Sequence, residues 1–323
     1  MNESLPNLQT PAPQPAPKGR GRKIISLVKI VLLLSVFALV GYVLVRQWKQ
    51  IDFTQVTIRP WPLVLSMVAL VCVSMVQMIS YRTLLSAYAH APTWPQMMAV
   101  AWVPPLGKYI PGKVAALLAA MTMLRKFGIP GAVAVSVVLA LDGLAVLAGL
   151  ITGAPLLFWE PIRRVAPWAW AVSLPAIACG IICLWPSVFG RGVNFLLRKL
   201  KKQPLPAMPP VRKYLVPVAC AFAQWVFAGV SLLLVIESVT GVRRLEELPL
   251  LIAFAAVAQT IGYLALFAPG GIGVREAILL AGLTPLVGPL AAVIVPIRAV
   301  SQILVDVVLA LVGMFIYKRH AAT

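Results

Sequence analysis

Long apolar runs alternate along the chain with short polar segments that carry prolines, glycines and basic side chains. At 1.5 Å per residue, a run of about 20 residues crosses a hydrocarbon core about 30 Å thick. The runs that reach this length, the last of them only just, are Ile24–Val45, Pro62–Tyr88, Gly131–Phe158, Trp168–Val188, Leu215–Val239, Pro289–Tyr317 and Pro249–Phe267. The pattern predicts an all-α, polytopic integral membrane bundle with about seven spans.

Three apolar runs are too short to span, namely Trp94–Pro105, Val114–Leu124 and Ala277–Val287. Runs of roughly 10–14 apolar residues are typical of buried or re-entrant helices. Each lies next to a proline–glycine break, "KYIPGKV" at 108–114 or "APGGIGVREA" at 268–277. We therefore expect two re-entrant hairpins.

The order of elements repeats. Pro62–Phe158 and Leu215–Tyr317 each read as a span, a Pro-Gly hairpin and a span. The first unit is expected to begin outside and the second inside, so the two units are inverted. Paired interrupted helices in corresponding halves indicate a transport site near the bilayer midplane.

These units lie in a transmembrane domain of residues 24–317. Residues 1–23 are predicted to be a disordered, proline-rich and basic cytoplasmic tail, and residues 318–323 a second cytoplasmic tail. Between the units, residues 190–214 are interpreted as a basic cytoplasmic loop, with a short interfacial helix on anionic lipid as the alternative.

Composition supports a membrane protein. Of 323 residues, 61% are hydrophobic and 11% charged, and the mean hydropathy is +0.93. The net charge of +19 is explained by basic residues that flank the spans on the cytoplasmic side. This bias predicts a multi-pass membrane protein with both termini in the cytoplasm, and it argues against nucleic-acid binding.

The chain has little material for covalent chemistry. Its four cysteines lie in apolar stretches, and its two histidines, His90 and His320, lie in a loop and at the C-terminus. Neither a zinc centre nor a Ser-His-Asp site is expected. We predict a protein that is not an enzyme and carries no cofactor or metal.

Charged residues at membrane depth are the candidate functional groups. Each costs on the order of 2.5–3.5 kcal/mol at a helix centre, so it is expected to face protein or water. They are Lys108, Lys113, Asp142, Arg275, Glu276, Arg298 and Asp306. Asp142 lies near the middle of a span and is expected to contact a partner in the bundle. Arg298 and Asp306 are two helical turns apart and share a face.

The second break, at 268–277, is the sharper candidate for an anion site. Pro269 ends one helix, and Gly270, Gly271 and Gly273 permit backbone conformations that other residues resist. A helix restarting near Val274 would present unpaired N–H groups, and Arg275 adds a planar donor fork for a lipid phosphate. Glu276 would then pair with a cationic headgroup or with Arg298. In the alternative, Glu276 caps its own helix and Arg275 pairs with Asp306.

The first break has the same composition. Pro111 and Gly112 interrupt the helix, and Lys108 and Lys113 flank the interruption. These lysines either bind substrate or extend their ammonium groups to the membrane surface.

The two motifs resemble those of a known family. "PGGIGVREAILLAGL" resembles the characteristic motif of the lysylphosphatidylglycerol synthase transmembrane family, whose members are flippase-like membrane proteins, and "LGKYIPGKV" with "RKFGIP" resembles an earlier motif of its stand-alone members. The resemblance extends over Ile24–Tyr317. It implies substrate-binding roles for Tyr109, Pro111, Gly112, Pro269, Gly270, Gly271, Gly273, Arg275, Glu276 and Arg298.

One departure concerns the first motif. Several members have Gly-Glu and an arginine after the first Pro-Gly, where this chain has Val114, Ala115 and Ala116. The bifunctional members also carry a soluble aminoacyltransferase domain, which is not expected in a chain that ends at Thr323.

Together these features predict a flippase that moves a phospholipid or lipid-linked headgroup between leaflets, with membrane lipids as its partners. The substrate would be held by the breaks and by Lys108, Lys113, Asp142, Arg298 and Asp306. Loss of Arg275 is expected to impair transport without unfolding the protein. The alternative is a non-catalytic membrane subunit that docks a lipid-modifying enzyme or glycosyltransferase in envelope or hopanoid lipid synthesis.

Overall fold

The computed structural model describes residues 58–88, 92–109, 114–199, 210–265 and 268–321. The structure is 89% helical with no strand in these ranges, so the all-α membrane fold is confirmed. Of the described helices, five are long and apolar enough to cross a membrane, or six if one bent pair forms a single span. The predicted span Ile24–Val45 lies outside the described residues, and the total of about seven spans stays a prediction.

The first predicted unit is built as a long helix, a hairpin and a second long helix. Its elements are α2 (Pro60–Ala87), α3 (Trp94–Trp102), η2 (Pro104–Tyr109), α4 (Val114–Lys126), α5 (Gly131–Gly153) and η3 (Ala154–Phe158). Pro60 starts α2 at a position where its missing N–H costs nothing. At the start of α3, the Gln96 side chain accepts a hydrogen bond of 2.9 Å from the Thr93 N–H, which satisfies one of the free donors at the helix end.

The second unit has the same order. Its elements are α9 (Val211–Thr240), η4 (Leu245–Glu247), α10 (Leu248–Leu264), η5 (Pro269–Gly271), α11 (Val274–Val287), η6 (Gly288–Leu290) and α12 (Ala291–Ala321). Helix α9 ends at Gly241, whose φ of 74° is the left-handed conformation that commonly closes a helix. A reversal of the chain at this point sends α10 back into the bundle.

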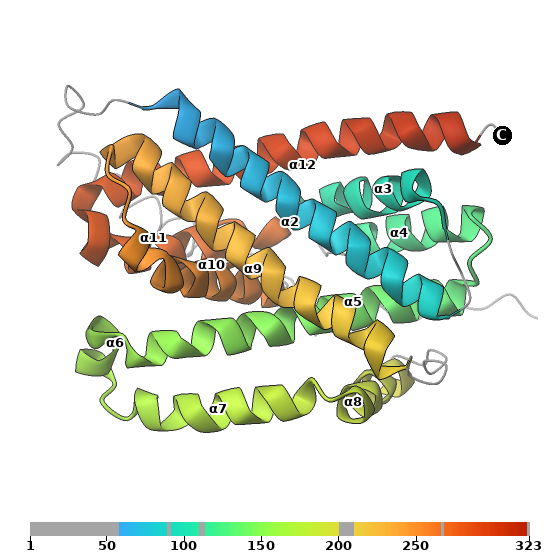
Figure 1. Cartoon of the computed structure of the whole chain (residues 1–323), viewed down its shortest axis with the longest axis horizontal. Coiled ribbons are helices and arrows are strands. Elements are labelled where there is room, and N and C mark those ends of the chain that lie inside the picture. Colours follow the sequence, from blue (N-terminus) through green and yellow to red (C-terminus); the bar gives the residue numbers. More distant parts are fainter. Residues whose placement is uncertain (1–57, 89–91, 110–113, 200–209, 266–267, 322–323) are drawn as a thin grey trace, which may run out of the picture.

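Helices α2 and α9 run antiparallel along each other at the centre of the molecule (Figure 1). At one end the Arg59 N–H donates to the Ser238 carbonyl at 2.8 Å. Further along, the Gln77 side-chain amide donates to Gln224 Oε1 at 3.2 Å. The leading helices of the two units therefore point in opposite directions.

Contacts between the units come in exchanged pairs. Helix α3 packs on α12 just as α10 packs on α5, and α12 packs on α2 just as α5 packs on α9. Helix α3 begins and α4 ends at one end of the bundle, whereas α10 begins and α11 ends at the other (Figure 1). The hairpin turns η2 and η5 meet between these ends. This exchange supports an inverted pair of units, whose boundaries stay a prediction.

The segment that links the units differs from the expected loop. It contains α6 (Glu160–Val165), α7 (Ala169–Cys183) and α8 (Pro186–Lys199), and α8 turns by 86° from the direction of the preceding helix. Residues 190–199, which we interpreted as part of a basic loop, are thus helical. Phe189, Val193 and Leu197 recur at intervals of four and are buried, which explains why a helix forms there.

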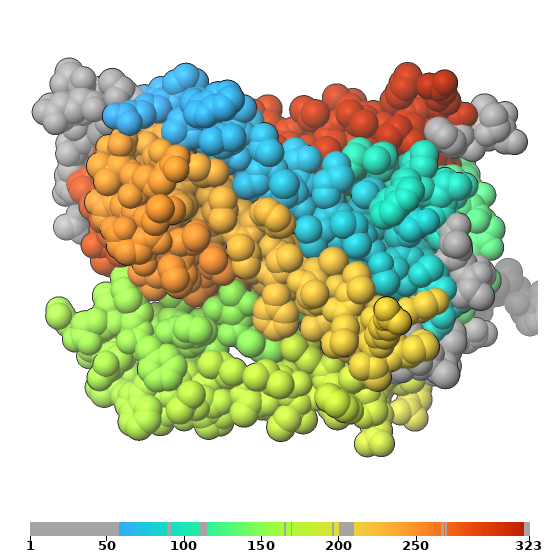
Figure 2. Space-filling view, in the orientation of Figure 1, coloured from blue at the N-terminus to red at the C-terminus, as the bar shows by residue number. Residues whose placement is uncertain are grey.

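The outer surface is strongly apolar. Helices α2 and α9 lie side by side on the face seen in Figure 2, with α7 along its lower edge. Large apolar side chains are exposed along α12 at Leu304, Val308, Leu311 and Phe315. Apolar surface of this extent is typical of helices in contact with lipid. Asp142 of α5 and Arg298 and Asp306 of α12, by contrast, face an internal cavity, where they form part of the site.

Candidate functional site

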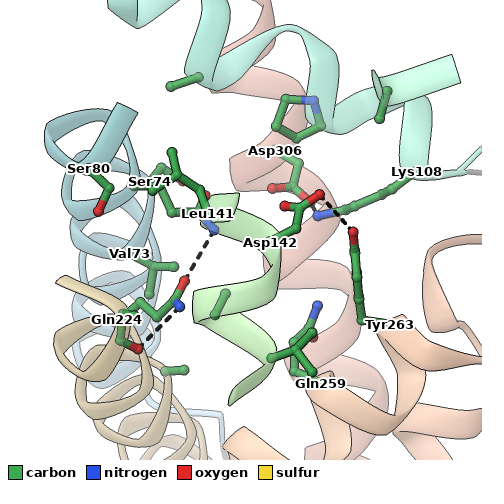
Figure 3. Close-up of a pocket in the computed structure, with 18 of the residues that line it drawn as sticks. Val73, Ser74, Ser80, Lys108, Leu141, Asp142, Gln224, Gln259, Tyr263 and Asp306 are labelled. Carbon is green, nitrogen blue, oxygen red and sulfur yellow. Dashed lines mark hydrogen bonds and ion pairs between the residues drawn. The ribbon is translucent and has the colours of Figure 1, made fainter. Parts of the chain in front are cut away.

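A central cavity of about 360 Å³ lies between the two units. Both units contribute to its wall, from α2 to α5 and from α9 to α12, including the hairpin turns η2 and η5. Charged side chains from different elements enter the cavity, as Figure 3 shows in part. The charged residues that line it are Lys108, Asp142, Arg275, Arg298 and Asp306. The hairpin turns η2 and η5 and five of the seven candidate charges therefore meet at one place.

Asp306 on α12 is the most heavily bonded carboxylate of the cavity. Its Oδ2 atom lies 2.6 Å from the Lys108 ammonium and accepts a hydrogen bond of 2.6 Å from the Tyr109 hydroxyl. Its Oδ1 atom accepts a bond of 3.2 Å from Gln302. The Asp306 side chain is only 7% exposed. Such a buried carboxylate needs this number of partners, because an uncompensated charge would be costly.

Arg298 is linked to the same cluster through an amide. Its Nη1 atom donates to Gln302 Oε1 at 3.2 Å, and Gln302 in turn donates to Asp306. The three residues follow one another at intervals of four on α12, as the shared helical face requires. Among the described residues, Arg298 forms no ion pair with a carboxylate. Its guanidinium enters the cavity bonded only to a neutral partner.

Asp142 on α5 has a different environment. Its Oδ2 atom accepts a hydrogen bond of 2.8 Å from the Tyr263 hydroxyl of α10 (Figure 3). The expected partner in the bundle is thus a tyrosine. No ion pair with Asp142 occurs within the described parts of the chain.

The two aspartates form matching bonds across the units. Tyr109, from the hairpin of the first unit, donates to Asp306 in the last helix of the second. Tyr263, from the hairpin of the second unit, donates to Asp142 in the last helix of the first. The main chemical difference is Lys108, whose ammonium neutralises Asp306 only.

The second break holds a buried ion pair between neighbours in sequence. Arg275 donates to Glu276 Oε1 from Nε at 2.8 Å and from Nη2 at 2.5 Å, and both side chains are buried. Glu276 Oε2 accepts a bond of 2.7 Å from the Gly273 N–H, and Arg275 also reaches Gln259. Glu276 therefore caps its own helix, as one of the alternatives predicted. Its partner is Arg275, and neither of the other two expected pairs, Arg298 with Glu276 and Arg275 with Asp306, is formed.

The glycines of this break are required by its geometry. Gly270, Gly271 and Gly273 all have positive φ, at 60°, 74° and 87°. A Cβ atom on Gly271 would lie 2.7 Å from the backbone of Gly262, and one on Gly270 would lie 3.1 Å from the Tyr109 ring. Pro269 begins η5 just before them. The turn is thus packed closely against α10 and against the tip of the first hairpin.

Part of the predicted first motif cannot be placed. Pro111, Gly112 and Lys113 lie outside the described residues. Lys108 and Tyr109, immediately before them, are the part of this motif that contacts Asp306.

Sequence reasoning missed the uncharged polar residues of the cavity. Gln77, Tyr81, Gln224, Gln259, Tyr263 and Gln302 all line it. Amide and phenol side chains in long apolar runs are unusual, and in lipid they need internal partners. That rarity was a usable signal for Tyr263 as a residue of the site, although not for its pairing with Asp142.

Comparisons with known proteins agree with this architecture. A search of curated proteins finds no match. The family model described as "Lysylphosphatidylglycerol synthase TM region" matches residues 26–312, which is nearly the whole chain. The chain therefore belongs to the lysylphosphatidylglycerol synthase TM region family, and it is a multi-pass membrane protein tied to lipid metabolism.

Proposed function

We propose that this chain moves the headgroup of an anionic phospholipid, or of a lipid-linked precursor, between the leaflets of the bacterial inner membrane. The headgroup passes through the central cavity, and no covalent bond is made or broken. Both termini lie in the cytoplasm. The observation that carries the proposal is the state of Arg298, which lines the cavity without a carboxylate partner among the described residues.

Arg298 differs in this respect from the other cations of the cavity. Lys108 is neutralised by Asp306, and Arg275 is neutralised by Glu276. The Gln302 amide is a weaker acceptor than a charged oxygen, since hydrogen bonds with an ionised acceptor are about twice as strong as neutral ones. A phosphate can accept two parallel bonds from a guanidinium. Arg298 is thus the residue best prepared to bind an anionic group.

The second break contributes less directly than the sequence suggested. The Gly273 N–H and the Arg275 fork, which were expected to hold phosphate, are both bonded to Glu276 in this conformation. We propose that they hold the shape of the turn, while Arg298 makes the main contact with the headgroup.

A lipid is a suitable substrate because the polar cavity is enclosed by helices whose outer faces are apolar. The acyl chains of a phospholipid can remain among side chains such as Val68 and Leu304, which are exposed on α2 and α12. Only the headgroup then needs to leave the membrane surface. Two opposed hairpins that meet at the cavity match the arrangement in which transporters alternate between sides.

The test is leaflet exchange of fluorescently labelled phosphatidylglycerol in proteoliposomes that contain the full chain. Arg298→Gln removes the guanidinium of Arg298 from the cavity. Arg164→Gln is the matched control, because Arg164 is 77% exposed and lies outside the cavity. We expect Arg298→Gln to slow exchange by about tenfold or more, since a charge-assisted bond contributes about 1.5–3 kcal/mol. The control should exchange lipid at the rate of the unmodified chain.

Equal rates for both variants would contradict the role of Arg298. No exchange of phosphatidylglycerol or of its lysyl derivative by folded protein would favour the alternative of a membrane subunit that docks a lipid-modifying enzyme. In that case a membrane enzyme should copurify with the chain.

A further inference from the structure

The two tyrosine–aspartate bonds of the cavity differ in charge compensation. At Asp306, a lysine ammonium, a phenol and an amide surround one carboxylate. At Asp142, the partner among the described residues is the Tyr263 hydroxyl, which donates a hydrogen bond of 2.8 Å. A carboxylate inside a helical bundle normally has a cation or a proton, because transfer of a bare charge from water is expensive. The first site obtains its cation from Lys108, and the second has none from the described chain.

Among the described residues, no cation forms an ion pair with Asp142. The elements that pack on α5 and line the cavity contribute Tyr81 from α2, Tyr263 from α10, Cys220 and Gln224 from α9, and only Ala116, Leu117 and Ala120 from α4. Elements α7, α8 and η3, which also pack on α5, contribute no residue to the cavity wall. The charged groups elsewhere in the cavity are Lys108, Arg275, Arg298 and Asp306. Of the three cations among them, only Arg298 has no carboxylate partner in the described ranges.

Asp142 and Arg298 line the same cavity, which is only about 360 Å³ in volume. An anionic headgroup bound to Arg298 is repelled by an ionised Asp142, and this repulsion is strong in a site of low dielectric. Protonation of Asp142 removes the repulsion. By reciprocity, binding of the anion must promote binding of the proton by the same factor.

We infer that Asp142 is a proton-binding site that couples headgroup transport to proton movement. A proton from water adds to the carboxylate as the anionic headgroup binds at Arg298, and it returns to water when the headgroup leaves. Proton and lipid then travel together, so a proton gradient can drive the lipid. Asp306 takes no part in this cycle, because the Lys108 ammonium already compensates its charge. The inference rests on the proposed function, because it takes the anion at Arg298 as the coupled ligand.

The test is infrared difference spectroscopy of the full chain in phosphatidylcholine bilayers, titrated from acid to alkaline pH. We expect a carbonyl stretching band of a protonated carboxylic acid that disappears as pH rises. The band should be absent in Asp142→Asn, present in Asp306→Asn and restored by Asp142→Glu. Asparagine keeps an oxygen that accepts from Tyr263, so Asp142→Asn is expected to fold.

Coupling is measured with the same band. Replacing part of the phosphatidylcholine by phosphatidylglycerol at fixed pH should increase the Asp142 band, and Arg298→Gln should abolish the increase. Absence of an Asp142 band at every pH at which the protein is folded would overturn the inference. An Asp142 band whose intensity does not change when phosphatidylglycerol is added would overturn the coupling.

The spectroscopy does not depend on lipid exchange, so the two proposals fail separately. If the Asp142 band titrates in protein that exchanges no lipid, the proposed flippase function is contradicted but the proton-binding site is supported. If lipid exchange requires Arg298 but the protein shows no Asp142 band, the flippase function is supported and the proton-binding site is contradicted. Where exchange is observed, an imposed pH gradient should accelerate it in the unmodified chain and leave Asp142→Asn unaffected.

Discussion

The ammonium of Lys108 lies 2.6 Å from the carboxylate of Asp306, and this ion pair joins the hairpin tip of one unit to the last helix of the other. It is one of the few polar links between the units inside the membrane. The pair therefore connects the position of the first hairpin to the charge state of the cavity.

Removing one member of this pair is expected to destabilise the protein. Asp306→Ala leaves the Lys108 charge without its carboxylate, and breaking a buried pair costs about 3–5 kcal/mol. The loss should fall at the lower end of that range because the Lys108 side chain is 26% exposed. The free energy of unfolding can be measured in mixed detergent micelles.

The double variant Lys108→Met with Asp306→Ala should recover part of this loss, since no charge is left uncompensated. Arg164→Gln breaks an exposed pair with Glu160 and should change the free energy of unfolding by less than about 1 kcal/mol. A double variant as unstable as the two single losses added together would show that the pair is not coupled.

Arg275→Ala is now expected to affect folding as well as transport. The sequence left Arg275 either free for a phosphate or paired with Asp306, but the structure pairs it with Glu276, whose side chain is 12% exposed. Its loss should cost about 3–5 kcal/mol. Arg298→Gln should cost clearly less, because the partner of Arg298 among the described residues is a neutral amide. Thermal unfolding of the two variants compares them directly, and equal melting temperatures would show that the Arg275–Glu276 pair contributes little to stability.

Close approach of α9 and α10 depends on a glycine. A Cβ atom on Gly229 would lie 2.6 Å from the Ile252 Cα and 2.9 Å from its backbone nitrogen. Gly229→Ala should therefore lower the free energy of unfolding by about 1–3 kcal/mol through overpacking. The matched control is Gly192→Ala in α8, where nothing lies within 4 Å of the added atom. That variant should be neutral or more stable by up to about 1 kcal/mol.

Side-specific labelling tests the opposite placement of the hairpins. Lys126 ends the first hairpin, whereas Glu246 begins the second, at the other end of the bundle (Figure 1). Single cysteines can be placed at these exposed positions after the four native cysteines are replaced. A membrane-impermeant thiol reagent should label Lys126→Cys only from the cytoplasm and Glu246→Cys only from outside. Labelling of both from one side would refute the inverted arrangement.

Much of the fold could be predicted from the sequence because the bilayer imposes a minimum length on apolar segments. The runs that become α2, α5, α9 and α12 are unambiguous for this reason. The run Trp168–Val188 was harder, since α7 ends at Cys183 and α8 starts at Pro186. Hydropathy alone does not report a bend between two apolar segments. The basic residues of α8 fitted a loop as well as an interfacial helix, and the sequence left both open.

The site was less predictable than the fold. Arg298 and Asp306 could be placed on one face, because helical periodicity is local. Lys108 could not be matched to Asp306, since the two residues come from different units and only the packed bundle brings them together. The pairing of Arg275 with its neighbour Glu276 depends on the bent turn before them, which contains three glycines at positive φ.

The link between Tyr109 and Asp306 also bears on how the chain is made. The two residues are 197 positions apart, so the ribosome delivers the first hairpin long before it delivers α12. In the interval, Lys108 and Tyr109 are in the translocon or the membrane without their carboxylate. In nascent chains truncated before α12, this hairpin should be less tightly packed. Membrane proteases should therefore degrade truncated chains faster than the full chain. The last helix thus acts as the closing step of assembly.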